Sequence, residues 1–354
     1  MTKSLKDAFY FQAKACQFQA KACQDLGSPF MHQLMMILGN QLTPDTPLTK
    51  RLFEWPGDLG PAGASLPLRL AGSLHSLSRQ GKGELNKVYP PNIVTDENLW
   101  KVVSNILQSE SIYINKFIDN PPQTNEVRRG AVLLAAGHWL AEKFKLPIQL
   151  FELGASAGLN LMWDRFELIV KNQSFGQSGS LVSLSPEWEG PLPEQTRPSI
   201  IGRSGVDLLP LDPVCDRDRL LSYLWPDQPQ RIALTDAAID IAEAKVDKAD
   251  AIDWLSQRLA AKEGVMQLVY STVAWQYLSH TEQQKGSVII ETAGRIATRT
   301  SPIAWFTMET DGKGPGAELS LRLWPGNYTI HMGRADFHGR WVDWSPPPVT
   351  GQLG

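Results

Sequence analysis

The sequence predicts an α/β protein with a doubly wound, mostly parallel sheet, preceded by a helical domain. Three observations lead to this prediction. Residues 148–160, IQLFELGASAGLN, read as a buried strand, a turn of small residues and a helix start. After them, strand-like and helix-like stretches alternate, which is typical of parallel sheets. Before them, the apolar spacing over residues 1–122 is helical only.

Length and composition describe an ordinary globular protein. The chain has 354 residues, 42% of them hydrophobic and 20% charged, and a formal net charge of −3. No basic cluster predicts binding to nucleic acid or to an anionic membrane, and no apolar run is long enough for a membrane span. Three scattered cysteines give neither a disulfide framework nor a metal site, and the N-terminus lacks the apolar core of a signal peptide. We therefore expect a reduced, cytoplasmic protein without a metal.

The first 122 residues are expected to form a helical domain on the substrate side of the site. Residues 30–38 are an apolar run between a proline and a glycine. Leu70, Leu74 and Leu77 share one face of a second helix, and a third helix begins near Asp96. None of these stretches contains a catalytic motif. The expected role of this domain is that of a lid that selects the substrate.

Residues 123–345 carry the alternating pattern, and we expect a flexible tail at residues 346–354. A proline-glycine-asparagine turn at residues 325–327 predicts a C-terminal antiparallel hairpin. Residues 166–198 are interpreted as an inserted β-hairpin. The expected strands are residues 148–151, 199–206, 266–270, 288–290, 303–308, 318–324 and 328–332. The expected helices are residues 125–144, 159–166, 220–225, 232–244, 252–259 and 282–285.

The turn at residues 154–158 fits two chemistries. Its GASAG sequence matches G-x-S-x-G, the nucleophile elbow of α/β-hydrolases, with Ser156 as the nucleophile and Asp311 and His338 following in the right order. Two observations weigh against this reading: the preceding 145 residues lack strands, and no HGGG-type segment is present for an oxyanion hole.

The second chemistry is cofactor binding. The run from Glu152 to Gly158 resembles motif I of class I S-adenosylmethionine-dependent methyltransferases, E/D-x-G-x-G-x-G, with Ser156 at the middle glycine. The glycines Gly154 and Gly158 let a backbone approach the cofactor closely. The resemblance implies that Glu152 holds the methionyl ammonium of S-adenosylmethionine or S-adenosylhomocysteine, with Asn160 just beyond the turn.

Three later segments resemble further methyltransferase motifs in the expected order. Asp207 stands where an acidic residue accepts the ribose hydroxyls, displaced along the chain by the inserted hairpin. Asp250 and Ala251 resemble the acidic pair that meets the adenine amino group. Residues 268–278 resemble motif IV, which implies a cofactor contact at Ser271 and a substrate contact at Trp275.

The whole arrangement resembles an uncharacterised prokaryotic family, domain of unknown function 2332, with a methyltransferase-like Rossmann core. The resemblance covers nearly the whole chain. It is based on QTNEVRR at residues 123–129, the ELGASAGLN run, GVD and PLD at residues 205–207 and 210–212, and HGRW at residues 338–341. The activity of this family is unassigned, so the resemblance implies a fold more than a reaction.

Two further groups of residues are candidates for the reaction. Tyr277 would stabilise a sulfonium through its ring, and His280 would remove a proton from the acceptor. Asn125, Glu126 and Arg129 begin the helix before the cofactor strand and would bind substrate. The alternatives are that Asn125 only caps this helix and that Glu126 and Arg129 form an ion pair with each other.

The sequence thus predicts transfer of a methyl group to a small-molecule oxygen, nitrogen or carboxylate acceptor. The open alternatives are a serine hydrolase that uses Ser156 and a Rossmann module that binds an adenosyl compound without turnover. The methyl acceptor and the oligomeric state do not follow from the sequence.

Overall fold

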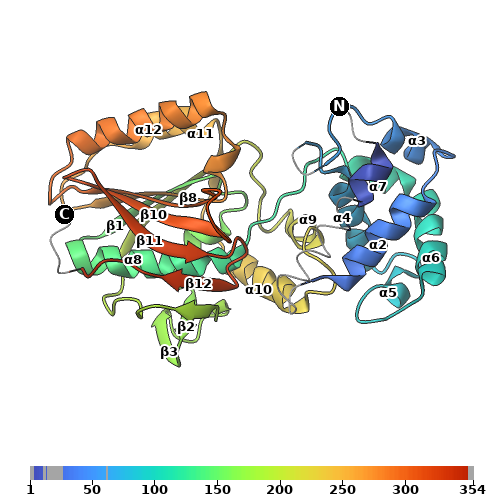
Figure 1. Cartoon of the computed structure of the whole chain (residues 1–354), viewed down its shortest axis with the longest axis horizontal. Helices are drawn as coiled ribbons and strands as arrows, with labels where there is room; N and C mark the ends of the chain where they lie inside the picture. Colours follow the sequence, from blue (N-terminus) through green and yellow to red (C-terminus); the bar gives the residue numbers. More distant parts are fainter. Residues whose placement is uncertain (1–3, 11–12, 14–26, 61–62, 350–354) are drawn as a thin grey trace. The chain divides into compact units, whose positions relative to one another are not determined.

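A computed structural model describes residues 4–10, 13, 27–60 and 63–349. The chain divides into two compact units (Figure 1). One unit is Met1–Thr124 with Asp216–Asp236, and the other is Asn125–Cys215 with Ala237–Gly354. Residues 216–236, which the sequence places in the α/β part, therefore group with the helices. Within the described residues, no helix is both long enough and apolar enough to span a membrane.

The first unit is helical. Its core includes the predicted face of Leu70, Leu74 and Leu77, and also Leu99 and Val103 of the helix that begins at Asp96, all buried. Side chains of Ser28, Thr46 and Thr95 cap three of the helices. The helices are α2 (Pro29–Gln41), α3 (Pro47–Phe53), α4 (Leu66–Arg79), α5 (Leu85–Val88), α6 (Asp96–Ser109), α7 (Ser111–Phe117), α9 (Arg217–Ser222) and the first part of α10 (Pro229–Asp240).

The later segment joins this unit through polar and aromatic contacts with α4. The imidazole Nδ1 of His75 lies 3.1 Å from the carbonyl oxygen of Ser222, and burial lowers the pKa of His75 to about 4. Ser76 donates a hydrogen bond to Asp218. Gly72 leaves no room for a side chain, because a Cβ there would lie 2.7 Å from the ring of Tyr223.

The second unit is built on a nine-stranded sheet in the order β5-β12-β11-β10-β9-β8-β1-β6-β7. Five neighbouring strands, β7, β6, β1, β8 and β9, are all parallel, and β10, β11 and β12 continue as an antiparallel meander. The strands are β1 (Ile148–Leu153), β5 (Glu187–Glu189), β6 (Ile200–Asp207), β7 (Val246–Lys248), β8 (Met266–Thr272), β9 (Ile303–Glu309), β10 (Ala317–Trp324), β11 (Tyr328–Ala335) and β12 (Trp341–Trp344).

The five parallel strands, numbered among themselves along the chain, run 3-2-1-4-5. The chain progresses outward from β1 in one direction to β7 and then in the other from β8 to β9. The carboxyl ends of β1 and β8 therefore lie side by side where the winding direction changes. The result is a mixed α/β fold with a large, mostly parallel sheet, as the sequence predicts.

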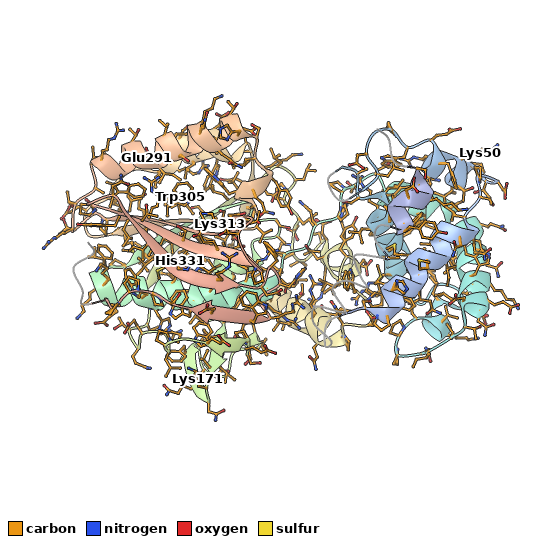
Figure 2. All side chains as sticks on the ribbon, viewed as in Figure 1. Lys50, Lys171, Glu291, Trp305, Lys313 and His331 are labelled. Carbon is orange, nitrogen blue, oxygen red and sulfur yellow. The ribbon has the colours of Figure 1, made fainter. Side chains whose placement is uncertain are left out.

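Helices cover both faces of this sheet (Figure 1). On one face, α11 (Ala251–Arg258) and α12 (His280–Arg295) pack on a core that includes Phe151, Val269 and Trp305. Trp305 of β9 and Glu291 of α12 are labelled in Figure 2. On the other face lies α8 (Gly130–Phe144), preceded by the turn η1 (Val127–Arg129). The 3-10 helix η2 (Leu159–Arg165) packs against α8, since a Cβ on Gly137 would lie 2.2 Å from the ring of Trp163.

The segment between η2 and β5 forms a second, three-stranded sheet in the order β3-β2-β4, before β5 pairs with β12 in the main sheet. Its strands are β2 (Glu167–Val170), β3 (Gln173–Gly176) and β4 (Ser183–Leu184). Because this segment leaves the main sheet, the strand that pairs with β1 is β6, far along the chain.

One local prediction is wrong. Residues 288–290 are not a strand but the middle of α12, which begins with a capping box formed by Ser279 and Glu282. The tail at residues 346–349 is held by α8, because Trp139 and Lys143 donate hydrogen bonds to the carbonyls of Pro347 and Val349. Residues 350–354 lie outside the described residues.

Candidate functional site

The turn after β1 has an unusual backbone. Gly154, Ser156 and Gly158 have φ values of 72°, 53° and 73°. Gly154 is also crowded, since a Cβ there would lie 2.5 Å from the Cβ of Ala274, in the loop after β8. Side chains other than glycine rarely adopt positive φ, and such residues cluster at functional sites. Ser156 is therefore the position where this turn is most strained.

The N–H groups of this turn bind the protein itself. The N–H groups of Gly154 and Ala155 both donate to the carbonyl oxygen of Val206, each at 3.0 Å. The N–H of Ser156 donates to Oδ2 of Asp207 at 2.9 Å. In phosphate-binding turns such N–H groups face the ligand. Here these three donors are used within the protein, and a carboxylate lies beside the turn.

Asp207 ends β6 and lies at the centre of this contact. Its Oδ1 accepts the N–H of Leu209 at 2.9 Å, and its carbonyl accepts the N–H of Ala249 at 3.2 Å. A carboxylate offers about four acceptor positions, and two backbone N–H groups occupy two of them. The side chain is half-buried, so the remaining acceptor capacity can serve hydroxyl donors.

Asp250 lies near Asp207 in space, because it directly follows Ala249, whose N–H binds the carbonyl of Asp207. Its Oδ1 accepts the N–H groups of Ile252 and Asp253 at 2.9 and 3.0 Å, so it is the N-cap of α11, and Ala251 is the first helical residue. The structure thus brings Asp207, Asp250 and the turn after β1 together at the carboxyl ends of β1, β6 and β7.

Glu152 is the most perturbed carboxyl group of the site. It lies on β1, is 2% exposed, and its Oε2 is 3.4 Å from the hydroxyl of Tyr270 on β8. Burial raises the pKa of Glu152 well above its usual range, the charge of Asp207 adds to this, and Arg129 opposes it. The neutral form is favoured until a cation comes near.

Residues 125–129 bind the turn from the other side. Asn125 Oδ1 accepts the N–H of Leu159 at 2.9 Å, and Asn160 Nδ2 donates to the carbonyl of Glu126 at 3.0 Å. The side chain of Glu126 also accepts the N–H of Arg128, so it caps η1. Asn125 and Glu126 are both buried and brace the turn.

Arg129 reaches the carboxyl end of β8. Its Nη1 donates to the carbonyl of Thr272 and its Nε to the carbonyl of Phe337, both at 2.8 Å. The turn that contains Phe337 also packs closely against Arg128, because a Cβ on Gly339 would lie 2.6 Å from the Arg128 backbone. Three stretches that are far apart in the sequence therefore meet beside β1.

The remaining candidate residues lie at the end of β8 and in the segment after it, and the structure does not bring them together. Ser271 is buried and its hydroxyl donates to Oε1 of Glu309 at 2.9 Å, so it serves an internal contact. The ring of Trp275 packs against Trp305, with ring centroids 5.0 Å apart, on the face covered by α12. Tyr277 is 75% exposed, and His280 is an exposed first residue of α12 whose Nε2 lies 3.0 Å from Gln284.

The triad that a serine hydrolase needs is not assembled. Ser156 Oγ is buried and has no hydrogen-bond partner among the described residues, which include all six histidines. Asp311 instead binds Arg334 through both carboxylate oxygens, at 2.9 and 3.0 Å. The backbone N–H of His338 donates to Asp336. The expected order of residues is present, but the contacts are not.

The residues present fit an adenosyl cofactor by their hydrogen-bonding capacity. Ser156 Oγ and Asn160 Oδ1 are both buried atoms without a partner in the described part of the chain. Buried polar atoms are nearly always paired, so these two are open to a ligand or a water molecule. Asp207 adds acceptor capacity for hydroxyls. Over the same described residues, no three histidine, cysteine or acidic side chains are grouped as metal ligands.

Glu309 is the residue that the sequence analysis missed. Its carboxylate accepts one hydrogen bond from Ser271 of β8 and three from backbone N–H groups of the loop after β8. A glutamate at the end of an apolar strand was the only signal in the sequence, and such a residue is usually solvent-exposed.

These features define an α/β protein with a polar, partly strained site at the carboxyl ends of its parallel strands. The chain belongs to a family described as "Uncharacterized protein conserved in bacteria (DUF2332)", whose model matches residues 13–344. A search of curated proteins found no match.

Proposed function

We propose that the second unit is a Rossmann-like, class I methyltransferase-like domain that binds S-adenosylmethionine and transfers a methyl group to a small-molecule oxygen, nitrogen or carboxylate acceptor. The parallel order 3-2-1-4-5 supports this fold, because doubly wound sheets of this order bind ligands where the winding direction changes. The turn after β1 and the loop after β8 meet at this point.

One observation carries the proposal: the Asp207 carboxylate is hydrogen-bonded to the Ser156 N–H. A dinucleotide needs the N–H groups of this turn for its pyrophosphate. Here those of Gly154, Ala155 and Ser156 are used inside the protein, and Asp207 adds a negative charge that would repel phosphate. An adenosyl compound without phosphates presents ribose hydroxyls, which are the donors that a carboxylate accepts. The site is therefore better suited to S-adenosylmethionine than to NAD.

The residues would share the work as follows. Asp207 would accept the ribose hydroxyls, and Asp250 with Ala251 would border the adenine. Glu152 would hold the methionyl ammonium and would lose its proton as this cation binds. Gly154 and Gly158 allow the positive φ values of the turn and its close packing against Ala274 and Val246.

Bound S-adenosylmethionine supplies an electrophilic methyl group on a sulfonium. The protein would contribute mainly by holding the two reactants in line. A carboxylate acceptor would need no general base, whereas a hydroxyl or amine would use His280 or Tyr277, whose exposed side chains follow β8.

The proposal is tested by isothermal titration of the full chain with S-adenosylhomocysteine. Asp207→Asn keeps one oxygen but sets an amide against a backbone N–H, and it removes the charge. Hydrogen bonds to a charged group contribute about 1.5–3 kcal/mol, so affinity should fall by about 10- to 150-fold. Asp253→Asn, an exposed aspartate on α11, is the matched control and should bind as wild type does. Wild-type protein that does not bind would overturn the proposal.

The two alternatives make different predictions. A non-catalytic adenosyl-binding module would bind S-adenosylhomocysteine in the same way but would methylate no acceptor. A serine hydrolase would be labelled at Ser156 by a fluorophosphonate, and it has less support because Ser156 Oγ has no base beside it.

A further inference from the structure

The carboxylate of Glu309 binds the end of β8 and the loop that follows it. Oε1 accepts the hydroxyl of Ser271 at 2.9 Å and the N–H groups of Ala274 and Trp275 at 3.1 and 3.0 Å. Oε2 accepts the N–H of Gln276 at 3.3 Å. Three successive backbone N–H groups thus point at one carboxylate, as they do around a bound anion. The chain supplies this anion itself, from the last residue of the neighbouring strand β9.

The loop held in this way has a strained backbone. Val273 has a φ of 55°, which is rare for a β-branched residue. Its N–H donates to the carbonyl of Met308, next to Glu309, at 2.8 Å. The side chain of Gln276 accepts the N–H of Thr310 at 3.0 Å, which ties the loop to the far side of Glu309 as well. Strain of this kind persists only where surrounding contacts enforce it.

The strained loop lies against the turn of the candidate site. A Cβ placed on Gly154 would be 2.5 Å from the Cβ of Ala274, the residue after Val273. Ala274 is also one of the residues whose N–H binds Glu309. The position of the carboxylate therefore sets how closely the two loops approach.

We propose that Glu309 is a positioning residue of the site, which holds residues 273–276 against the Gly154 turn so that the cofactor and acceptor sides keep a fixed separation. This inference rests on the proposed function. Glu309 acts through the loop and needs no contact with either reactant. Burial raises the pKa of the Glu309 carboxyl, while its four donors act in the opposite direction.

The test uses two variants and a control in the full chain. Glu309→Gln keeps one acceptor oxygen for some of the loop N–H groups. Its amide NH₂ group, however, replaces the second acceptor oxygen and faces N–H or O–H donors that it cannot accept from. Val273→Gly leaves Glu309 intact and removes the constraint that forces the loop into one conformation. Glu318→Gln is the control, because it makes the same chemical change on β10, where Glu318 pairs with the exposed His331 at the surface. Each protein is measured by amide hydrogen exchange, by urea denaturation and by titration with S-adenosylhomocysteine.

In Glu309→Gln, exchange at residues 274–276 should accelerate at least tenfold, exchange at residues 154–155 should also rise, and affinity should fall about tenfold. Val273→Gly should lose a similar affinity with an unchanged urea midpoint, which a purely structural role of the loop would not produce. Wild-type affinity in both variants would overturn the inference.

The inference can also be separated from the proposed function. If wild-type protein does not bind S-adenosylhomocysteine, the proposed function fails, and hydrogen exchange alone decides the role of Glu309. Faster exchange in both loops of Glu309→Gln would then uphold the coupling, and unchanged exchange at residues 274–276 would refute it.

Discussion

Gly154→Ala tests whether the turn after β1 and the loop after β8 are tightly packed. Gly154 has a φ of 72°, and an added Cβ would lie 2.5 Å from the Cβ of Ala274. An alanine in the left-handed region costs about 1–2 kcal/mol. Overpacking a tight contact costs about 1–3 kcal/mol more. The substitution should therefore lower the free energy of unfolding by about 2–5 kcal/mol.

Gly264→Ala is the matched control for this prediction. Gly264 lies in the same unit with a φ of 73°, but no atom lies within 4 Å of the added Cβ. Only the conformational cost of about 1–2 kcal/mol applies there. Urea denaturation of both variants measures the difference, which we assign to the contact with Ala274. Equal losses in the two variants would show that the loops have room to separate, and would refute the packing on which the site is based.

Three further predictions follow from the same contacts. Glu152→Gln should raise the free energy of unfolding at pH 7 by about 1 kcal/mol, the size of common stabilising substitutions. It should also lower the affinity for S-adenosylhomocysteine. Because the pKa of Glu152 is raised in the native state, the wild-type free energy of unfolding should fall as pH rises from about 4.3, the pKa in the unfolded chain, through the native pKa. Urea denaturation from pH 4 to 8 should show this fall in wild type and less of it in the variant. An equal pH dependence in the two proteins would contradict the prediction. Gly339→Ala, with its Cβ 2.6 Å from the Arg128 backbone, should lower the free energy of unfolding by about 2–5 kcal/mol. Gly312→Ala, where the space is open, should lower it by only about 1–2 kcal/mol. Equal urea midpoints for the two variants would argue against this packing. A fluorophosphonate probe should leave Ser156 unlabelled in mass spectra, and labelling there would favour the hydrolase.

Much of the fold was predictable because its signals are local. The strands β1, β8 and β9 are mostly apolar runs. These three strands and β6 were each expected within a residue or two of their observed bounds. The turn signal at residues 325–327 predicted the hairpin of β10 and β11. The short strands β5, β7 and β12 have too few residues to give a pattern, and they form only because a neighbouring strand is present to pair with.

The strand predicted at residues 288–290 failed for a related reason. An apolar run of three residues fits a strand or a buried helical turn equally well. The capping box at Ser279 and Glu282 was the better signal, since it starts a helix that continues to Arg295.

The candidate site was predicted in part. The order of motifs predicted Asp207 as a ribose-binding residue at the end of a later strand, and in the structure its carboxylate contacts the turn after β1. What the sequence did not indicate is that this contact uses the N–H of Ser156, or that Glu309 binds the loop after β8. Both depend on which strand ends lie side by side, and that order is set by long-range pairing, not by neighbouring residues.

The central claim is that the Asp207 carboxylate, seated on the Ser156 N–H, recognises an adenosyl ribose. A crystal structure of the full chain grown with S-adenosylhomocysteine measures this directly. We predict both ribose hydroxyls within hydrogen-bond distance of Asp207, with the adenine beside Asp250. A ligand bound elsewhere, or a phosphate group seated on the turn at residues 154–158, would contradict it.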